Sequence, residues 1–194
     1  SISALIPSTV PRSGRVIRSF SAGPDFPEAI DTPRGLAPSP DGRTLAVTEG
    51  DGSVELIDTT SLQRRAVVKA LDHTALSVAY SPNGGLLAVA GAGRWVTLWD
   101  ARTFTPLRTF EHGTAIVAAA IAADGSLVAT ATRDGSVSVW DGATQALITV
   151  FRHGDLASSV DFAPTGAHLL SAGFDRRAVI WDVTGEKPKL LFKL

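Results

Sequence analysis

The sequence contains no cysteine, and this single absence excludes several classes of protein. A disulfide-stapled scaffold, a zinc site built on thiolates and an enzyme with a cysteine nucleophile all require that residue. A chain of 194 residues needs no covalent staples, because a domain of this size buries roughly 70% of the surface that its unfolded chain exposes. With 44% hydrophobic and 19% charged residues, the composition predicts a folded globular protein.

The chain also lacks an excess of either charge, with 18 Lys and Arg against 19 Asp and Glu. A surface that binds nucleic acid needs clustered cations without compensating anions, so we expect no nucleic-acid partner. No apolar run approaches the roughly 18 residues of a membrane span, and the first residues lack the basic-then-apolar order of a signal peptide. We therefore expect no membrane contact and a cytoplasmic location.

Two markers repeat along the chain in step with each other. The first is a turn of four residues that ends in glycine and begins at positions 39, 81, 122 and 163. The second is a bulky residue followed by aspartate, and it occurs as Ile57-Asp58, Trp99-Asp100, Trp140-Asp141 and Trp181-Asp182. Both markers recur at spacings of 42, 41 and 41 residues, which indicates four internal repeats.

Each repeat is predicted to contain four β-strands. The segments between the markers are short, rich in β-branched residues and alternating in polarity, and Gly, Asp and Pro turns separate them. In the third repeat we place strands near residues 115–121, 127–131, 136–140 and 146–151. A four-stranded sheet that is apolar on both faces must be covered by its neighbours, which predicts an all-β propeller of antiparallel blades.

The order of these elements resembles that of WD-repeat propellers over residues 33–194: a Pro-Asp-Gly turn, a strand, an Asp-Gly turn, a strand that ends in Trp-Asp, and a loop with His. The first repeat, with Ile57 in place of Trp and no preceding His, is more similar to the YVTN-type propeller repeat. The resemblance implies blades at residues 33–70, 73–111, 112–152 and 153–194. Residues 1–13 are predicted to be a linker or a disordered terminus.

Residues 14–23 are predicted to form one further outer strand with its exit loop, which four blades cannot accommodate. The WD-repeat family is typically seven-bladed, so four blades alone would form an arc with exposed edges. We therefore expect the ring to be completed by a longer parent protein or, as the alternative, by a second copy. The absence of methionine favours the first account, and a compact monomer would instead indicate a closed four-bladed ring.

The resemblance also implies a buried hydrogen-bonded chain in each complete blade. Such a chain joins a His before the first strand, a hydroxyl on the second strand, an Asp in the next turn and the Trp on the third strand. One full set is expected, in the third blade: His112, Thr132, Asp134 and Trp140. Because every buried polar group of this set would have a partner, we expect the third blade to be the most rigid.

The other blades are predicted to carry partial sets. In the fourth blade His153, Asp175 and Trp181 are present, with Gly173 at the hydroxyl position. In the second blade His73 and Trp99 are present, with Gly91 and Gly93 at the hydroxyl and carboxylate positions. The first blade retains Asp51 alone of the four.

These histidines also bear on the question of enzymatic activity. His73, His112 and His153 occupy equivalent positions, one in each repeat, so they belong to separate blades and do not converge on one site. The sequence contains no Gly-x-Ser-x-Gly elbow, His-Glu-x-x-His motif or phosphate-binding loop. We therefore predict structural histidines and expect no catalytic residue, no metal site and no cofactor.

The loops at one rim are the predicted interaction surface, because the strands of a propeller are committed to packing. The candidate residues there are Arg94, Trp95, Arg133, Asp155, Leu156 and Phe174. Trp95 stands where the later repeats have Ser136 and Arg177, so it is either an interface anchor or an aromatic packed on the neighbouring blade.

We interpret the chain as a non-catalytic protein-interaction scaffold or sensor module within a larger protein or complex. The alternative is a propeller enzyme or small-ligand-binding protein of the YVTN or lactonase type, with its site in the central channel. The predicted innermost strands, near residues 77–81, 117–121 and 158–162, carry Asp161 as their sole carboxylate, which favours the scaffold.

Overall fold

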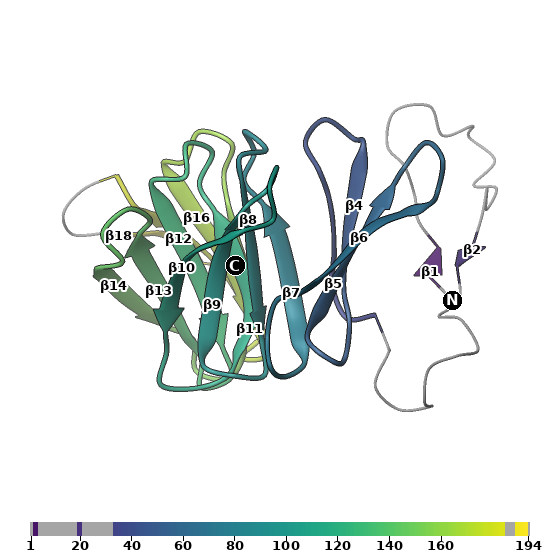
Figure 1. The fold of residues 1–194 in the computed structure, drawn as a ribbon. Helices are drawn as coiled ribbons and strands as arrows, with labels where there is room; N and C mark the ends of the chain where they lie inside the picture. The colour runs from purple at the N-terminus through teal and green to yellow at the C-terminus, as the bar shows by residue number, and fades with distance from the viewer. Residues whose placement is uncertain (1, 4–18, 21–32, 185–188, 194) are drawn as a thin grey trace, which may run out of the picture.

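The computed structural model of the chain describes residues 2–3, 19–20, 33–184 and 189–193. All regular elements in this part of the chain are β-strands, which confirms the predicted all-β class. The strands form four four-stranded antiparallel sheets and one two-stranded sheet (Figure 1). No helix in the described ranges is long and apolar enough to cross a membrane.

Each four-stranded sheet uses four consecutive strands of the chain, and we call each sheet a blade. Blade 1 contains β3 (Leu36–Pro38), β4 (Thr44–Thr48), β5 (Ser53–Asp58) and β6 (Arg64–Lys69). Blade 2 contains β7 (Ala75–Tyr80), β8 (Leu86–Gly91), β9 (Trp95–Asp100) and β10 (Pro106–Glu111). Blade 3 contains β11 (Ile116–Ile121), β12 (Leu127–Thr132), β13 (Ser136–Asp141) and β14 (Leu147–Arg152). Blade 4 contains β15 (Ala157–Phe162), β16 (His168–Gly173), β17 (Arg177–Asp182) and β18 (Lys189–Lys193).

The two-stranded sheet pairs β1 (Ile2–Ser3) with β2 (Ser19–Phe20) in antiparallel register. The predicted outer strand at residues 14–23 is described only at Ser19 and Phe20, and the predicted linker at residues 1–13 only at Ile2 and Ser3. The remaining residues of both predicted segments lie outside the described residues.

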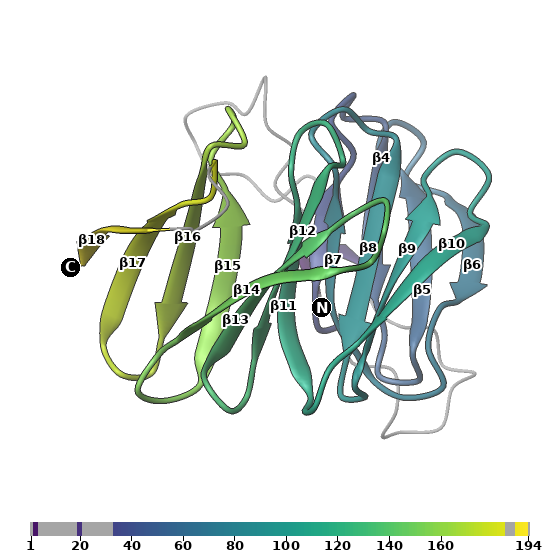
Figure 2. The ribbon, with the colours of Figure 1, turned by 90° about the vertical axis from the view of Figure 1, so that its left-hand side faces the viewer.

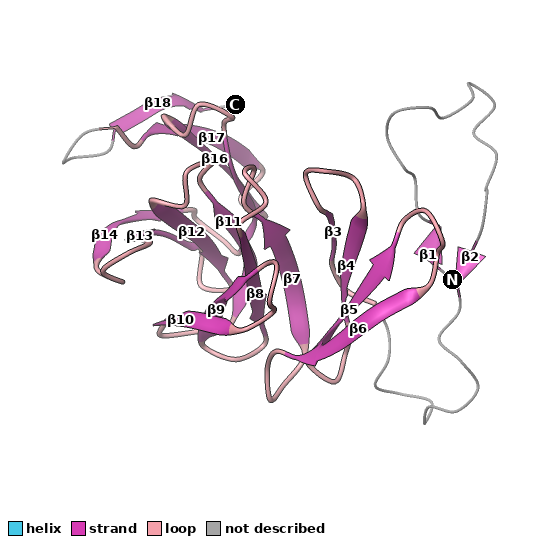
Figure 3. Cartoon of the chain, turned by 45° about the horizontal axis from the view of Figure 1, so that its top comes forward, coloured by secondary structure: helices cyan, strands magenta, loops and turns pink. Residues whose placement is uncertain are grey.

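The blades follow one another in chain order around an arc, with their first strands on the inside (Figures 2 and 3). The inner strands β7, β11 and β15 pack against one another in sequence, and β3 packs against β7. Blades 1 and 4 lie at the two ends of the arc (Figure 3). The four-stranded sheets thus have the arrangement of propeller blades.

The repeated turn glycines have a backbone conformation that other residues rarely adopt. Gly42, Gly84, Gly125 and Gly166 have φ angles of 70°, 73°, 77° and 72°. In each turn the glycine N–H donates to the carbonyl of the residue three positions earlier, over 2.8 to 2.9 Å. A left-handed residue at this place closes the hairpin between the first two strands of each blade, which explains why the first sequence marker ends in glycine.

The repeated aspartates cap the start of the turn that follows the third strand of each blade. Asp100 Oδ1 accepts the backbone N–H groups of Arg102 and Thr103, both over 2.8 Å. Asp141 Oδ1 accepts the equivalent groups of Ala143 and Thr144, over 2.9 and 2.6 Å. Backbone donors hold the pKa of both carboxyl groups below the usual value, so these aspartates act as ionised caps of a turn.

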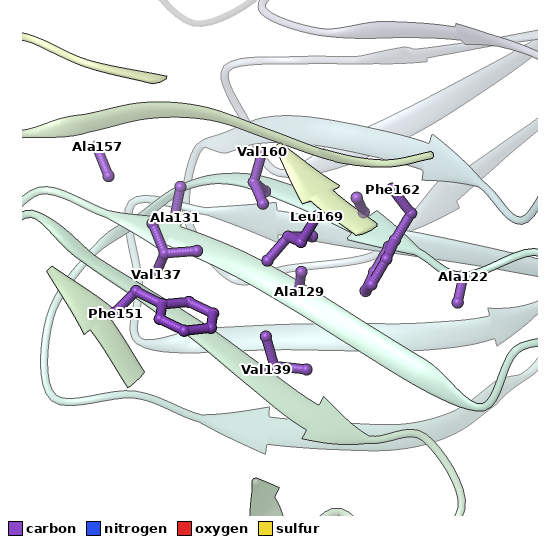
Figure 4. Close-up of a cluster of buried hydrophobic side chains, with 11 residues drawn as sticks. Ala122, Ala129, Ala131, Val137, Val139, Phe151, Ala157, Val160, Phe162 and Leu169 are labelled. Atoms are coloured by element: carbon purple, nitrogen blue, oxygen red, sulfur yellow. The ribbon is translucent and has the colours of Figure 1, made fainter. Parts of the chain in front are cut away.

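The hydrophobic core consists of three apolar clusters, one between each pair of consecutive blades. In the cluster between blades 3 and 4, Phe162 and Leu169 of blade 4 face Ala129 and Val139 of blade 3 (Figure 4). Each blade therefore depends on its neighbour for the burial of its apolar faces.

Candidate functional site

Blade 4 contains a complete hydrogen-bonded chain of four side chains. His153, in the loop before β15, places Nδ1 3.0 Å from Asp175 Oδ1 and Nε2 2.9 Å from Ser171 Oγ. The Trp181 indole donates its Nε1–H to the same Ser171 oxygen over 3.0 Å. A neutral imidazole with its proton on Nδ1 satisfies this chain, because Nε2 then accepts the Ser171 hydroxyl proton.

The Asp175 carboxylate is fixed by the backbone as well as by the histidine. Its Oδ2 accepts the N–H of Gly154 over 3.0 Å, and the side chain is only 9% exposed. The Gly154 donor and then His153 hold the pKa of Asp175 below its usual value. This carboxylate therefore ties the entry loop of blade 4 to the turn between β16 and β17.

The hydroxyl of this chain differs from the sequence prediction. Gly173 stands at the position expected to carry it, whereas Ser171, two residues earlier, supplies it. A Cβ at Gly173 would lie 2.8 Å from His153 Nδ1, so glycine there makes room for the imidazole. Blade 4, which was predicted to be incomplete, brings all four functional groups together.

Blade 3, which was predicted to hold the full set, divides its polar groups between two clusters. His112 Nε2 lies 3.0 Å from Thr130 Oγ1, and Trp140 Nε1 donates to the same oxygen over 3.3 Å. Thr130, not the predicted Thr132, is therefore the hydroxyl between this histidine and this tryptophan. The rings of His112 and Trp140 also meet edge to face, with centroids 4.7 Å apart.

The second cluster of blade 3 contains the predicted Thr132 and Asp134. Thr132 Oγ1 donates to Asp134 Oδ1 over 2.7 Å, and the Ser136 backbone N–H donates to the same oxygen over 3.0 Å. The Asp134 side chain is 48% exposed, and its Oδ2 lies 3.9 Å from an Arg152 nitrogen. The Thr132 donor holds the pKa of Asp134 below its usual value, while burial lowers the pKa of His112 to about 4.

Blade 2 keeps the histidine and the tryptophan but has no polar residue between them. Val89 stands at the position of Ser171, ten residues before the tryptophan, and Gly93 stands at the position of Asp175. Among the described residues His73 Nε2 and Trp99 Nε1 have no hydrogen-bond partner, although both atoms are buried. A Cβ at Gly93 would lie 1.5 Å from His73 Nε2, so the imidazole occupies the space that an aspartate would need.

Blade 1 retains only the capping function of its aspartate. Asp51 Oδ1 accepts the backbone N–H and the hydroxyl of Ser53 over 2.8 and 2.6 Å, and Oδ2 lies 3.6 Å from Lys69 Nζ. Val47 and Ile57 stand at the hydroxyl and tryptophan positions. Among the described residues, the side-chain network from histidine to tryptophan is thus absent from blades 1 and 2, lacks its carboxylate in blade 3 and is complete in blade 4.

The predicted interaction residues lie on turns that backbone hydrogen bonds join to the neighbouring loops. The His112 N–H donates to the Arg94 carbonyl over 2.7 Å, and the Arg133 N–H donates to the Ala115 carbonyl over 3.1 Å. The Phe174 N–H donates to the Leu156 carbonyl over 2.8 Å. The turns after each second strand and the loops before each first strand therefore form one rim.

The exposure of these residues varies along the rim. Phe174 is 67% exposed, and Trp95 is 39% exposed. Arg94, Arg133 and Asp155 are exposed, and Leu156 is half-buried. Phe174 and Leu156 come together in blade 4, whereas Trp95 belongs to blade 2. Both interpretations of Trp95 stay open, because its side chain is partly packed and partly accessible.

Two further observations concern ligand binding. The described residues contain no group of three or more His, Asp or Glu side chains that could hold a metal ion. A groove of about 620 Å³, which sequence reasoning missed, lies between blades 1 and 2, with Asp41, Arg65 and Tyr80 in its wall. Burial, with Asp41 nearby, raises the pKa of Tyr80 to about 12. Residues from three turns and four strands form this groove, so no local motif could have indicated it.

A succession of four-stranded antiparallel sheets, joined by cores between neighbours, is the arrangement of blades in the β-propeller class of repeat proteins. Comparison with protein families identifies the repeat itself: the WD domain, G-beta repeat family matches residues 66–100, 104–141 and 145–182. These matches cover more than half of the chain, which therefore belongs to this family. A comparison with curated proteins finds no match to the chain.

The family repeat and the structural blade are offset by one strand. The match at residues 66–100 extends from the outer strand of blade 1 to the third strand of blade 2, and the other two matches have the same phase. The first three strands of blade 1 lie outside the matches. The YVTN-type similarity of that first repeat stays a prediction.

Proposed function

We propose that this chain is a non-catalytic scaffold or sensor module that binds proteins and acts within a larger protein or complex. Membership of the WD-repeat family supports this kind of function, because such repeats generally serve as protein-interaction modules. A net charge of −1 supports protein partners over nucleic acid. A cytoplasmic location belongs to the same proposal, and imaging of the tagged protein in cells tests it.

The observation that carries this proposal is an exposed aromatic side chain on a fixed turn. Phe174 is 67% exposed, while its own N–H is bonded to the Leu156 carbonyl. The next residue, Asp175, is held by His153 and by the Gly154 backbone. An aromatic side chain on an ordered backbone loses little conformational entropy on binding, so this turn is well suited to anchor a partner.

Affinity capture with matched variants tests the proposal. We expect Phe174→Ala to lose captured proteins that the unmodified chain retains, with no change in melting temperature. Leu147→Ala, which truncates an exposed side chain on the outer strand β14, is the control and should retain them. Identical capture by both variants would contradict the proposal.

Trp95→Ala separates the two interpretations of that residue: lower stability with unchanged capture assigns it to packing.

A further inference from the structure

The groove between blades 1 and 2 lies at the end of the blades opposite the rim. The turns after the first strands of both blades and the turn after the third strand of blade 2 line it, together with four strands. Every residue of its wall belongs to these two neighbouring repeats, so the groove does not depend on the ends of the chain. Its volume of about 620 Å³ lies within the range of roughly 300–1,000 Å³ that is typical of small-ligand pockets.

Apolar side chains form the part of the wall nearest the core between the two blades. Leu56 is 1% exposed, and Tyr80 and Phe104 pack against the same apolar cluster. Phe104 has a φ of 54°, and Leu62 and Gln145, at the same place in blades 1 and 3, have φ angles of 58° and 65°. Because this turn accepts a glutamine in blade 3, the fold does not require an aromatic residue there. The aromatic lining is therefore a property of this groove.

Two arginines stand in the same wall, one from each blade. Arg65 Nη1 donates to Thr44 Oγ1 over 3.0 Å, which holds its guanidinium against blade 1. Arg102, in the turn after β9, is exposed. Neither guanidinium is in an ion pair among the described residues. Guanidinium groups without a carboxylate partner favour an anionic ligand, because their fork of donors matches a carboxylate, sulfonate or phosphate.

Asp41 and Tyr80 complete the polar part of the wall. Asp41 Oδ1 accepts the Ser39 hydroxyl over 2.6 Å and the Arg43 backbone N–H over 3.0 Å, so this carboxylate caps its own turn. Since the pKa of Tyr80 is about 12, its phenol stays protonated at neutral pH and can donate a hydrogen bond. The two arginines against this one carboxylate leave an excess of positive charge in the wall.

An equivalent groove between blades 3 and 4 lacks this chemistry. Its volume is about 270 Å³, and its wall contains neither an arginine nor an aromatic residue. Asp124 keeps the place of Asp41, but Thr184 stands at the place of Arg102. The propeller architecture therefore provides a groove at this place without cations or aromatic rings, and those of the first groove are specific to blades 1 and 2.

We propose that the groove between blades 1 and 2 binds a small organic anion with an aromatic or other apolar body. Arg65 and Arg102 bind the anionic group, and the Tyr80 hydroxyl donates a hydrogen bond to it. Phe104 and Leu56 contact the apolar body. This site goes beyond the proposed rim function and does not depend on it, because the rim lies at the other end of the blades.

Two fluorescent probes that differ in charge test the proposal. Anilinonaphthalene sulfonate is an aromatic anion, and phenylnaphthylamine has the same rings without the sulfonate. The unmodified chain should bind the anion more tightly than the uncharged probe. Arg65→Gln and Arg102→Gln should each weaken binding of the anion by about 10-fold and leave binding of the uncharged probe unchanged. Arg34→Gln removes the same charge from an exposed residue outside the groove, and this control should bind both probes as the unmodified chain does.

Tyr80→Phe gives a second test if an arginine variant lowers the melting temperature. It keeps the ring and removes only the hydroxyl donor, so it should weaken binding of the anion alone. NMR then locates the bound anion: the backbone amide signals of Gly84 and Ala101 should shift, and those of Gly166 and Thr184 in the other groove should not.

Three outcomes would overturn the proposal. The first is equal affinity of the unmodified chain for the two probes, which would mean that the groove does not select an anion. The second is full binding of the anion by both arginine variants. The third is an equal shift of the amide signals in the two grooves, because the second groove lacks the arginines and the aromatic rings.

Discussion

Blades 2 and 4 share a histidine before the first strand and a tryptophan on the third strand, yet the side-chain nitrogens of these residues differ in their hydrogen bonding. In blade 4 each of these groups has a partner, through Ser171 and Asp175. In blade 2 Val89 and Gly93 replace both partners, and the two buried nitrogens are left without one among the described residues. The comparison teaches that the histidine and tryptophan identify a WD-type blade, whereas the residue ten positions before the tryptophan completes the network.

The substitution Ser171→Ala should have the largest effect, because it makes blade 4 resemble blade 2. It leaves His153 Nε2 and Trp181 Nε1 buried and unpaired, so we expect a loss of roughly 2–4 kcal/mol in the free energy of unfolding. Denaturant titration measures this loss. Ser158→Ala, in which one hydrogen bond to the Ala172 carbonyl is lost from the same blade, is the control and should cost less. Equal losses would contradict the assignment.

Asp175→Ala should have the next largest effect. It removes the carboxylate that joins His153 to the Gly154 backbone, and both donors then face an apolar methyl group. We expect a clear fall in melting temperature, larger than that of Asp134→Ala or Asp51→Ala. Those two carboxylates cap the turns before β13 and β5, and among the described residues neither accepts a hydrogen bond from a histidine. A larger fall for Asp134→Ala would contradict the greater contribution that the geometry assigns to Asp175.

Val89→Thr tests the comparison in the opposite direction, by restoring a hydroxyl to blade 2. The substitution conserves volume and offers Trp99 Nε1 an acceptor, at the cost of burying one hydroxyl. We expect a gain of up to about 1 kcal/mol in the free energy of unfolding. The same change at Val47 in blade 1, where Ile57 offers no donor, should be destabilising. Stabilisation at both sites would show that the indole plays no part.

The pH dependence of stability examines blade 3. The pKa of His112 is about 4 in the folded chain, against 6.5 for a free histidine. Between these values the unfolded chain binds more protons, so stability must fall as pH decreases from 6.5 to 4. The aspartates with lowered pKa add their own loss of stability from about pH 5 downward, so the contribution of His112 is measured between pH 6.5 and about 5. His112→Gln should reduce the slope of the free energy of unfolding against pH by the equivalent of no more than about one bound proton. An unchanged slope would contradict the burial of a neutral imidazole.

The smallest effect is expected for Thr132→Gly, which should change the direction of the Asp134 side chain. The Thr132 hydroxyl donates a hydrogen bond to the Asp134 carboxylate. Gly173, at the equivalent position in blade 4, has no side chain that could donate to Asp175 in place of His153. Thr132→Gly should therefore release Asp134 toward His112 and raise the pKa of that histidine, because a nearby carboxylate favours the imidazolium. A titration of His112 followed by NMR measures this shift. Ser126→Gly, which removes the hydroxyl donor of Asp124 in the same blade, is the control and should not produce it.

The regular features of the fold could be predicted from the sequence because local chemistry determines them. The turn glycines have positive φ, and the aspartates after the tryptophans cap the next turn. The four strands of blade 3 begin and end within one residue of the predicted positions. Each of these features depends on residues only two to four positions apart.

The register of the polar chain could not be predicted in the same way. Thr130 and Thr132 lie two residues apart on one strand, so their side chains point to the same face, and alternation alone cannot choose between them. A register shift between Ile116 and Ala118 on β11 changes which backbone groups lie opposite them. The direction of each aspartate depends in turn on whether its neighbour offers a hydroxyl, as Thr132 does and Gly173 does not.

The distribution of tryptophan has a practical consequence for following how the protein unfolds. The chain has 4 tryptophans: Trp95 and Trp99 in blade 2, Trp140 against His112 in blade 3, and Trp181 stacked on Phe151 in blade 4. Blade 1 has none. Variants that keep only Trp99, Trp140 or Trp181 would give blades 2, 3 and 4 separate fluorescence signals. Coincident transitions would then identify one cooperative unit, and staggered transitions would give the order in which neighbouring blades separate.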